Sequence, residues 1–298
     1  GRLMWLGHAW AHRLDQKQHT WQVLDEHDQI LAQGDALILA NAHGVRNLLD
    51  TLPDALAVAP MPMGQVRGQI SRLPPAAAPG ATAPQCPVAG SGYALGLSDG
   101  SLLCGATSHH HDLDPSVREA DHQHNLRQAA RLGAWHPVDD APLPKGLQGR
   151  VGWRATTADR LPLVGALPLP LSQLQAAARP VRLEQPRLIP RRQDANGGLY
   201  VISGLGSRGI TWAALAARLL AHWVAGSPCP VEADLRDALD PARWPRRQAR
   251  RPHVVDLELE HAGGLHAARQ QRDEALPHGL RRRDGHLLAH DAARQRDE

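Results

Sequence analysis

Phenylalanine is absent from this sequence and tyrosine occurs only twice, so eight tryptophans supply most of the aromatic surface. A buried core must therefore be built from leucine, valine, isoleucine and alanine. With 42% hydrophobic residues, the 298-residue chain has enough apolar surface for one large domain or two modest ones. We therefore expect a mainly globular protein.

Cysteine is scarce as well. The three cysteines, Cys86, Cys104 and Cys229, are far apart in the chain and form no CxxC pair. This spacing excludes a disulfide framework and a thiolate metal site. It fits a protein of a reducing, cytoplasmic compartment.

Long hydrophobic runs are also lacking. The longest lies within residues 210–224 and is interrupted by Arg218 and His222, so it falls short of a membrane span. No charged-then-apolar leader follows Gly1. We therefore expect a soluble chain that has no membrane partner and begins inside a longer protein.

Histidine is plentiful, but its spacing does not predict a metal site. His109, His110 and His111 are adjacent, and three neighbouring side chains on extended backbone do not converge easily on one ion. His8 and His12 are spaced to share a helix face, but no third ligand accompanies them. We assign no metal.

The excess positive charge lies near the end of the chain. Residues 1–240 hold 21 Lys and Arg against 21 Asp and Glu, whereas the remaining residues hold 12 against 9. Five arginines and no acid lie between Arg243 and Arg251. This run predicts either a footprint for a polyanion such as RNA or a solvated, flexible end.

Apolar periodicity and turn residues indicate the local elements. Buried or half-buried strands are expected at residues 21–24, 30–32, 36–40 and 199–203, and a helix is expected at 210–224. Asp99-Gly100 predicts a hairpin with a two-residue turn between residues 93–98 and 101–107. Asp114-Pro115 supplies an N-cap and a first-turn proline for a surface helix that runs to about Leu132.

The segment Gly204-x-Gly206-x-x-Gly209 has the spacing of a dinucleotide-binding loop, with a predicted strand before it and a helix after it. Glycine lets backbone N–H groups approach an anion closely, and the helix N-terminus adds a favourable dipole. No second buried strand ending in an acid follows, which disfavours a complete nucleotide-binding unit and an NAD dehydrogenase. Either the loop contacts another part of a cofactor, or it is a tight turn without a ligand.

A second informative stretch runs from Trp153 to Gly165. It places an arginine, a hydroxyl, a carboxylate and a proline at close spacing before an apolar strand. Arg154 can hold a substrate carboxylate through two parallel hydrogen bonds. Most arginines in such segments are surface residues or form structural ion pairs, so the motif is weak by itself.

Four motifs follow one another along the chain: Ala36–Gly44, a strand with a glycine turn; Val66–Ile70, containing Arg-Gly-Gln; Arg154–Gly165; and the glycine loop Gly204–Gly209. In this order they resemble the FAD-dependent amino-acid oxidases of the D-amino-acid oxidase and glycine oxidase family. The resemblance implies an α/β fold, in which a doubly wound FAD-binding domain carries an inserted, mainly antiparallel β-sheet substrate domain.

The resemblance also implies the domain boundaries. The flavin-binding domain would consist of residues 1–60 and 155–240, and it would be incomplete because the family's N-terminal GxGxxG is missing. The substrate domain would be residues 61–154. Nothing after about residue 245 matches the family, so we expect 241–298 to be a disordered or unrelated tail.

The same resemblance assigns roles to residues. Those implied to bind FAD are Asn41, Ala42, Gly44, Gly204, Gly206, Ser207, Arg208 and Gly209. Those implied to bind substrate are Arg67, Gly68, Gln69 and Arg154, of which Arg154 is the catalytic-site candidate that holds the substrate carboxylate. Arg208 is an alternative substrate contact.

Within this family the motifs are most similar to the oxidase half of the bifunctional enzymes that modify the wobble uridine of tRNA. That similarity implies FAD-dependent removal of the carboxymethyl group from 5-carboxymethylaminomethyl(-2-thio)uridine, with release of glyoxylate. It implies tRNA as a partner and a fused upstream methyltransferase half that uses S-adenosylmethionine. Two alternatives stay open, a free glycine or D-amino-acid oxidase and an inactive truncated fragment.

Overall fold

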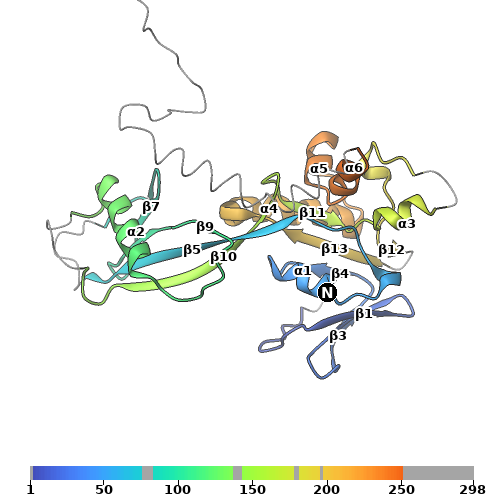
Figure 1. The fold of residues 1–298 in the computed structure, drawn as a ribbon, viewed down its shortest axis with the longest axis horizontal. Helices are drawn as coiled ribbons and strands as arrows, with labels where there is room; N and C mark the ends of the chain where they lie inside the picture. The colour runs from blue at the N-terminus through green and yellow to red at the C-terminus, as the bar shows by residue number, and fades with distance from the viewer. Residues whose placement is uncertain (1–2, 76–82, 137–142, 178–180, 195–196, 251–298) are drawn as a thin grey trace, which may run out of the picture.

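The computed structural model describes residues 3–75, 83–136, 143–177, 181–194 and 197–250, and it contains three β-sheets (Figure 1). The N-terminal sheet is an antiparallel meander of β1 (Arg13–Lys17), β2 (Thr20–Leu24) and β3 (Ile30–Gly34). Both strands predicted in this region are therefore confirmed. Leu14 and Trp21 are fully buried against the rest of the fold.

The second sheet is built around β13 (Gly197–Ser203), which pairs antiparallel with β11 (Leu163–Ala166) and β12 (Gln193–Asp194) and parallel with β4 (Leu37–Leu39). Helix α1 (Gly44–Leu49) follows β4 directly. Helix α4 (Gly209–Ala225) follows β13 through the one-turn helix η4 (Gly206–Arg208). We call this sheet the flavin sheet, after the domain that the sequence predicts here.

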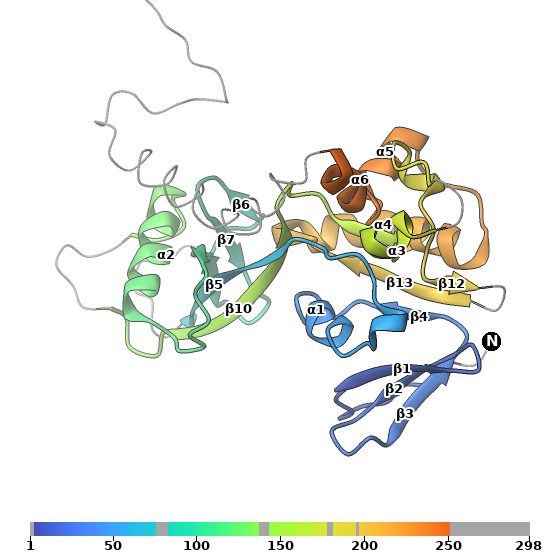
Figure 2. The same ribbon diagram turned by 45° about the vertical axis from the view of Figure 1, so that its right-hand side comes forward.

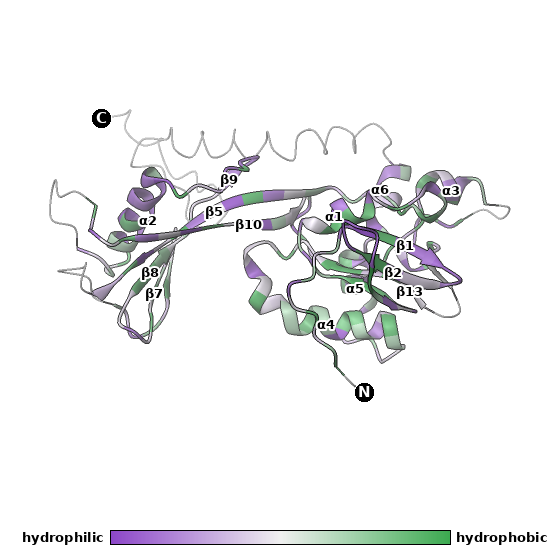
Figure 3. Ribbon diagram, turned by 90° about the horizontal axis from the view of Figure 1, so that it is seen from below, coloured by the Kyte–Doolittle hydropathy of each residue, from purple (hydrophilic) through white to green (hydrophobic). Residues whose placement is uncertain are grey.

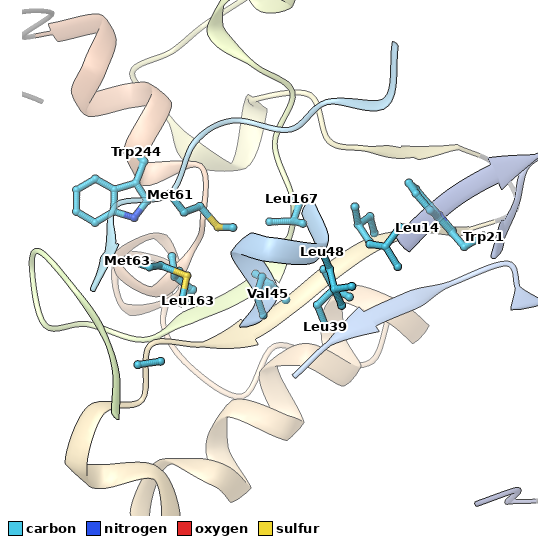
Figure 4. Packing of buried hydrophobic residues seen from close by; sticks show 13 residues of the cluster. Leu14, Trp21, Leu39, Val45, Leu48, Met61, Met63, Leu163, Leu167 and Trp244 are labelled. Carbon is cyan, nitrogen blue, oxygen red and sulfur yellow. The ribbon is translucent and has the colours of Figure 1, made fainter. Parts of the chain in front are cut away.

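Strands β11 and β13 of the flavin sheet are buried on both faces, and the residues of β13 alternate between two cores. Leu199 and Val201 pack with Val45 and Leu163 in the cluster of Figure 4. Tyr200 packs with residues of α4 on the other face. This double burial explains why 199–203 reads as a continuous apolar run.

The third sheet is dominated by two long strands, β5 (Met63–Leu73) and β10 (Gln148–Thr157), which pair antiparallel without a break in register. In Figures 1 and 2 they extend away from the flavin sheet as one twisted ribbon. Three shorter strands complete the sheet at its far end: β6 (Val88–Ala89), β7 (Tyr93–Gly96) and β8 (Leu102–Gly105). Strand β9 (His109–His110) pairs with the earlier part of β5, at Val66 and Arg67. Helix α2 (Glu119–Arg131) covers one face.

Two local predictions in this region need correction. The hairpin of β7 and β8 exists, but Leu97 N–H donates to Ser101 O across a three-residue loop in which only Gly100 has positive φ, at 80°. Helix α2 begins at Glu119, four residues later than predicted. The Asp114 carboxylate accepts a hydrogen bond from the Ser116 N–H and so caps a local turn instead of the helix.

The fold continues past residue 240, where the sequence places the end of the flavin-binding domain. Helix α5 (Ala233–Leu239) is followed by α6 (Arg243–Arg250), whose first turn is packed into the fold. Trp244 is 2% exposed and belongs to the core cluster of Figure 4. Arg243 is equally buried and pairs with Asp159. The remainder of the predicted tail, residues 251–298, lies outside the described residues.

The remaining helices are short and lie in connections. They are η1 (Asp54–Leu56), α3 (Leu171–Gln175) and η3 (Pro186–Leu188). Among the described residues, no helix is both long and apolar enough to cross a membrane.

A buried polar network attaches α2 to β5. Arg67 is fully buried and donates to the Asp121 carboxylate at 2.6 Å and to the Asp114 carbonyl at 2.7 Å. Ser71 and His122 are hydrogen-bonded at 2.7 Å. Burial alone would raise the pKa of Asp121, but hydrogen bonds from Arg67 and His109 hold it below its usual value. Directed polar contacts therefore compensate for the few apolar positions on α2.

We predict that Arg67→Met lowers the free energy of unfolding by about 3–5 kcal/mol, because it leaves the Asp121 carboxylate buried without its partner. Urea denaturation measures this loss. The matched control is Arg72→Met on the same strand, whose pair with Asp99 is about half exposed and should contribute less than about 1 kcal/mol.

The Arg67→Met deficit should also depend on pH. A depressed carboxyl pKa contributes stability above its unfolded value, and this stability is lost as pH falls through the folded value. The difference in the free energy of unfolding between wild type and Arg67→Met should therefore become smaller as the pH is lowered. A difference that is small at neutral pH, or that widens in acid, would contradict the assigned pair.

Candidate functional site

Two loops lie side by side at one edge of the flavin sheet. Strands β4 and β13 are parallel, with Leu39 opposite Val201, so the turn at residues 41–44 and the glycine loop at 204–209 leave the sheet at the same end. The Ser203 hydroxyl donates to the Ala42 carbonyl at 2.9 Å and ties the two together. In α/β sheets, ligands bind outside the carboxyl ends of parallel strands. This edge is therefore the first component of the candidate site.

Backbone conformation requires glycine at two positions of the loop, and lack of space requires it at one of them. Gly204 and Gly206 both have left-handed backbone, with φ of 68° and 56°. A Cβ at Gly204 would lie 2.9 Å from Thr157 Cγ2, whereas a Cβ at Gly206 would meet only Thr156 Cγ2, at 3.9 Å. The space beside Gly206 is therefore open. Exposed Ser207 and Arg208 lead from it into the first turn of α4.

Arg154 is the second component of the site. It lies on β10 beside β5, and a Cβ on Gly68 would come within 2.7 Å of both its terminal nitrogens. The guanidinium thus lies against the backbone at Gly68. Its hydrogen bond to the Thr107 carbonyl is 3.2 Å long, and it pairs with no carboxylate among the residues that the structure describes. Such a guanidinium is free to bind an added carboxylate.

The two components meet through the end of β10. Thr156 lies two residues beyond Arg154, on the same face of the strand, and it faces Gly206 of the glycine loop. Two residues of strand span about 7 Å. The predicted pairing of Arg154 with the glycine loop is therefore compatible with one shared pocket, although the loops at 41–44 and 204–209 belong to a different sheet.

Tyr93 is a residue of this face that the sequence did not single out. It pairs with Gly105, which pairs with Ile70, and this register puts Tyr93 on the face that carries Gly68 and Arg154. Burial raises the pKa of Tyr93, and the nearby Arg154 opposes the rise. The phenol therefore stays protonated at neutral pH and can donate a hydrogen bond. Only long-range strand pairing reveals this position, so local sequence could not.

Arg67 and Gln69 do not line this face, contrary to the prediction. Both are fully buried under α2, on the opposite face of β5 from Gly68. The Arg67 guanidinium is committed to Asp121, and the Gln69 amide exchanges two hydrogen bonds of 2.8 Å with the backbone of Arg118. Successive side chains on a strand point to opposite faces, so only the middle residue of Arg-Gly-Gln borders the site.

The turn at residues 41–44 keeps its predicted cofactor role as a prediction. Ala42 has φ of 52°, and Gly44 packs so closely on Asn41 that a Cβ would be 2.9 Å from Asn41 Nδ2. Asn41 and Ala42 are exposed. Within the described ranges, no three histidine, cysteine or acidic side chains gather closely enough to hold a metal ion.

Comparison with known proteins adds a family to this geometry. The family model described as FAD dependent oxidoreductase matches residues 8–223. The bifunctional tRNA 5-methylaminomethyl-2-thiouridine biosynthesis protein MnmC of Methylibium petroleiphilum is 51% identical over 235 residues, which is 78% of this chain and 34% of that protein. The protein of the same name from Burkholderia multivorans is 40% identical over 242 residues, 81% of this chain and 34% of its own length.

The chain thus spans about a third of the length of these curated relatives. Among solved structures, glycine oxidase from Geobacillus kaustophilus superposes with a TM-score of 0.53 at 18% identity, covering 76% of this chain and 51% of that one. Iminodiacetate oxidase from Chelativorans has a TM-score of 0.52 at 23% identity, with the same coverage. These two likenesses establish the fold and confirm the predicted α/β class.

We predict that neither tyrosine ionises at its ordinary pKa of 10.0 while the chain is folded, because burial raises the pKa of both Tyr93 and Tyr200. The chain contains no other tyrosine. The ultraviolet absorbance of tyrosinate should therefore rise at higher pH in the native chain than in urea. Tyr93→Phe and Tyr200→Phe assign the two transitions.

The sign of the effect is fixed by linkage. A pKa that is raised on folding contributes stability below the unfolded value, and this stability is lost as pH rises through the folded value. The native chain should therefore lose stability as these phenols ionise. A native titration that coincides with the unfolded one would contradict the burial of Tyr93 in the site.

Proposed function

The chain belongs to the family of FAD-dependent oxidoreductases, and on this basis we propose that it forms the oxidase part of an enzyme acting on tRNA. The reaction that we propose removes the carboxymethyl group from 5-carboxymethylaminomethyl(-2-thio)uridine at the wobble position and releases glyoxylate. The observation that carries this proposal is Arg154, which lies two residues before Thr156, the residue that faces the glycine loop, and pairs with no carboxylate in the described part of the chain.

FAD is the cofactor of this family, and the residues of the site suit it. The glycine loop supplies open backbone at Gly206, where any side chain would occupy space on the ligand side, and it leads directly into the N-terminus of α4. The first turn of a helix has N–H groups without helical partners and a positive dipole end. Gly204, Gly206, Ser207, Arg208 and Gly209 would hold the flavin ring in this way.

Asn41, Ala42 and Gly44 would contact another part of the cofactor from the neighbouring turn. Two features support completion of the flavin domain by further polypeptide. Strand β4 pairs only with β13 among the described strands, so its other edge is open. Helix α4 is largely hydrophobic, as its colour in Figure 3 shows, yet Ile210 is 98% exposed and Leu215 and Val224 are 37% exposed.

When bound, FAD supplies the two-electron oxidation of the carbon–nitrogen bond. The protein's contribution is to orient the reacting carbon. Arg154 would bind the carboxylate of the carboxymethyl group through its two terminal nitrogens. The absence of a side chain at Gly68 leaves the space that the guanidinium occupies. The protonated Tyr93 hydroxyl would donate to the same carboxylate. Once this carboxylate is bound, the carbon next to it would face the glycine loop across the end of β10.

The remaining parts of the proposal concern the whole protein. The relatives carry the name of a bifunctional tRNA enzyme, and two thirds of their length lies outside the match. We propose that a methyltransferase half using S-adenosylmethionine is fused to this oxidase. We retain the substrate domain at residues 61–154 and the discontinuous flavin-binding domain, with the latter extended at its C-terminal end to Arg250.

The test uses the full chain fused behind the preceding part of the Methylibium relative, so that both sides of the cofactor site are present. After addition of FAD and gel filtration, the protein should retain flavin absorbance. It should release glyoxylate from tRNA that bears the carboxymethylaminomethyl base. Activity on free glycine with none on this tRNA contradicts the proposed substrate, and a colourless protein contradicts the cofactor site.

We further predict that Arg154→Met lowers kcat/KM for the carboxylated substrate roughly 10- to 100-fold, because the free energy of hydrogen bonds to a charged group corresponds to a factor of this size. The kcat/KM of Arg154→Lys should lie between those of wild type and Arg154→Met, since lysine keeps the charge but lacks the planar guanidinium. The matched control is Arg150→Met, an exposed arginine four residues earlier on the same strand.

A substrate analogue with an amide in place of the carboxylate sharpens this test. Wild type should discriminate strongly against the amide, whereas Arg154→Met should not. Equal discrimination by both proteins would assign the carboxylate to another residue, of which Arg208 is the first candidate.

A further inference from the structure

Helices α5 and α6 border a groove of about 470 Å³ that is separate from the glycine loop. They lie side by side on the flavin domain, drawn in orange and red in Figures 1 and 2. Four arginines line the groove: Arg243, Arg246, Arg247 and Arg250. The carboxylates of Asp234 and Asp237 lie on the α5 side.

Two of these arginines are held by the fold itself. Arg243 donates from Nε to Asp159 at 2.8 Å and from an amino group to the Leu161 carbonyl at 2.9 Å. Arg247 donates to the same Asp159 carboxylate at 2.8 Å and lies 4.6 Å from the ring centre of Trp244. These contacts fix one wall of the groove and place α6 against the connection between β10 and β11.

The other two arginines are available. Arg246 is half-buried and Arg250 is exposed, and neither guanidinium forms a hydrogen bond or an ion pair in the part of the chain that the structure describes. Asp237 is already paired with Arg236 at 3.2 Å. Four arginines face two carboxylates in the lining, so the groove keeps an excess of positive charge, and the groove arginines belong to helix α6.

The groove is also close to the site along the chain. Asp159, which holds α6, accepts a hydrogen bond from Thr157, and Thr157 packs against Gly204 of the glycine loop. A polymeric substrate whose reacting base lies in the site would therefore bring its flanking backbone near α6. Guanidinium groups bind phosphate through paired N–H donors.

We propose that the α5–α6 groove binds a phosphodiester segment of the RNA substrate through Arg246 and Arg250, while Arg243 and Arg247 are positioning residues that hold α6 in place. This assignment rests on the proposed action on tRNA. It divides the basic run Arg243–Arg250, which looks uniform in sequence, into two structural and two ligand-binding residues.

The test measures binding of tRNA to the FAD-loaded fusion protein by fluorescence anisotropy over a range of salt concentrations. The variant is R246Q/R250Q. Its control, R182Q/R187Q, removes the same charge from two exposed arginines elsewhere on the flavin domain. We expect the groove variant to reduce the slope of log affinity against log salt by about two, one unit for each phosphate contact. Affinity at moderate salt should fall on the order of tenfold.

The control should leave the slope unchanged, and R246K/R250K should restore most of the affinity. Equal losses in the groove and control variants would show general attraction to a basic protein and would overturn the proposal. A competition experiment can also overturn the proposal. It would do so if binding of inorganic phosphate or a mononucleotide depended on Arg246 and Arg250 and binding of tRNA did not.

The outcome is separable from that of the proposed function. If the groove is wrong and the function right, R246Q/R250Q oxidises tRNA with unchanged KM. If the function is wrong and the groove right, tRNA binds with the expected dependence on Arg246 and Arg250, yet no glyoxylate is released.

Discussion

The antiparallel pairing of β5 with β10 is the constraint on which the rest of the structure depends. It runs for ten residues on β10 without a bulge and carries the chain from the flavin sheet to α2 and back. Because side chains alternate along a strand, this one register assigns Arg67, Gln69 and Ser71 to α2 and leaves Gly68 under Arg154. A slip by one residue would exchange the polar network with the candidate site.

A second constraint locks the end of β10. The Asp159 carboxylate accepts hydrogen bonds from Thr157 and from two arginines of α6, and its burial is offset by these donors, so its pKa lies below the usual value. The same connection packs on Gly204. The position of the glycine loop is thus fixed by an ion pair with a helix that the sequence suggested lay outside the fold.

Much of the architecture was predictable because it depends on local pattern. The strand at 199–203, the glycine loop and the helix after it are where periodicity places them, and the hairpin at Asp99-Gly100 exists. Arg154 pairs with no carboxylate in the described part of the chain, and its role in the site stays a prediction. The boundary of α2 was misplaced because Asp114 caps a turn instead of the helix.

What was not predictable depends on contacts between distant residues. The family resemblance assigns Arg67 and Gln69 to the site together with Gly68, whereas the pleat of the strand sends Gly68 to the opposite face from these two residues. Tyr93 joins the site only through two successive strand pairings. Trp244 is buried within the most basic stretch of the described chain, where composition alone indicates solvent.

The alternation along β5 has a consequence for how this protein can change over time. Neighbouring positions on the strand face separate surroundings, the buried polar network under α2 on one side and the proposed carboxylate site on the other. Substitutions on the side facing Arg154 would therefore change the proposed carboxylate site without first weakening the scaffold. On a strand of this kind, substitutions can accumulate on the face of the proposed site while the fold is retained.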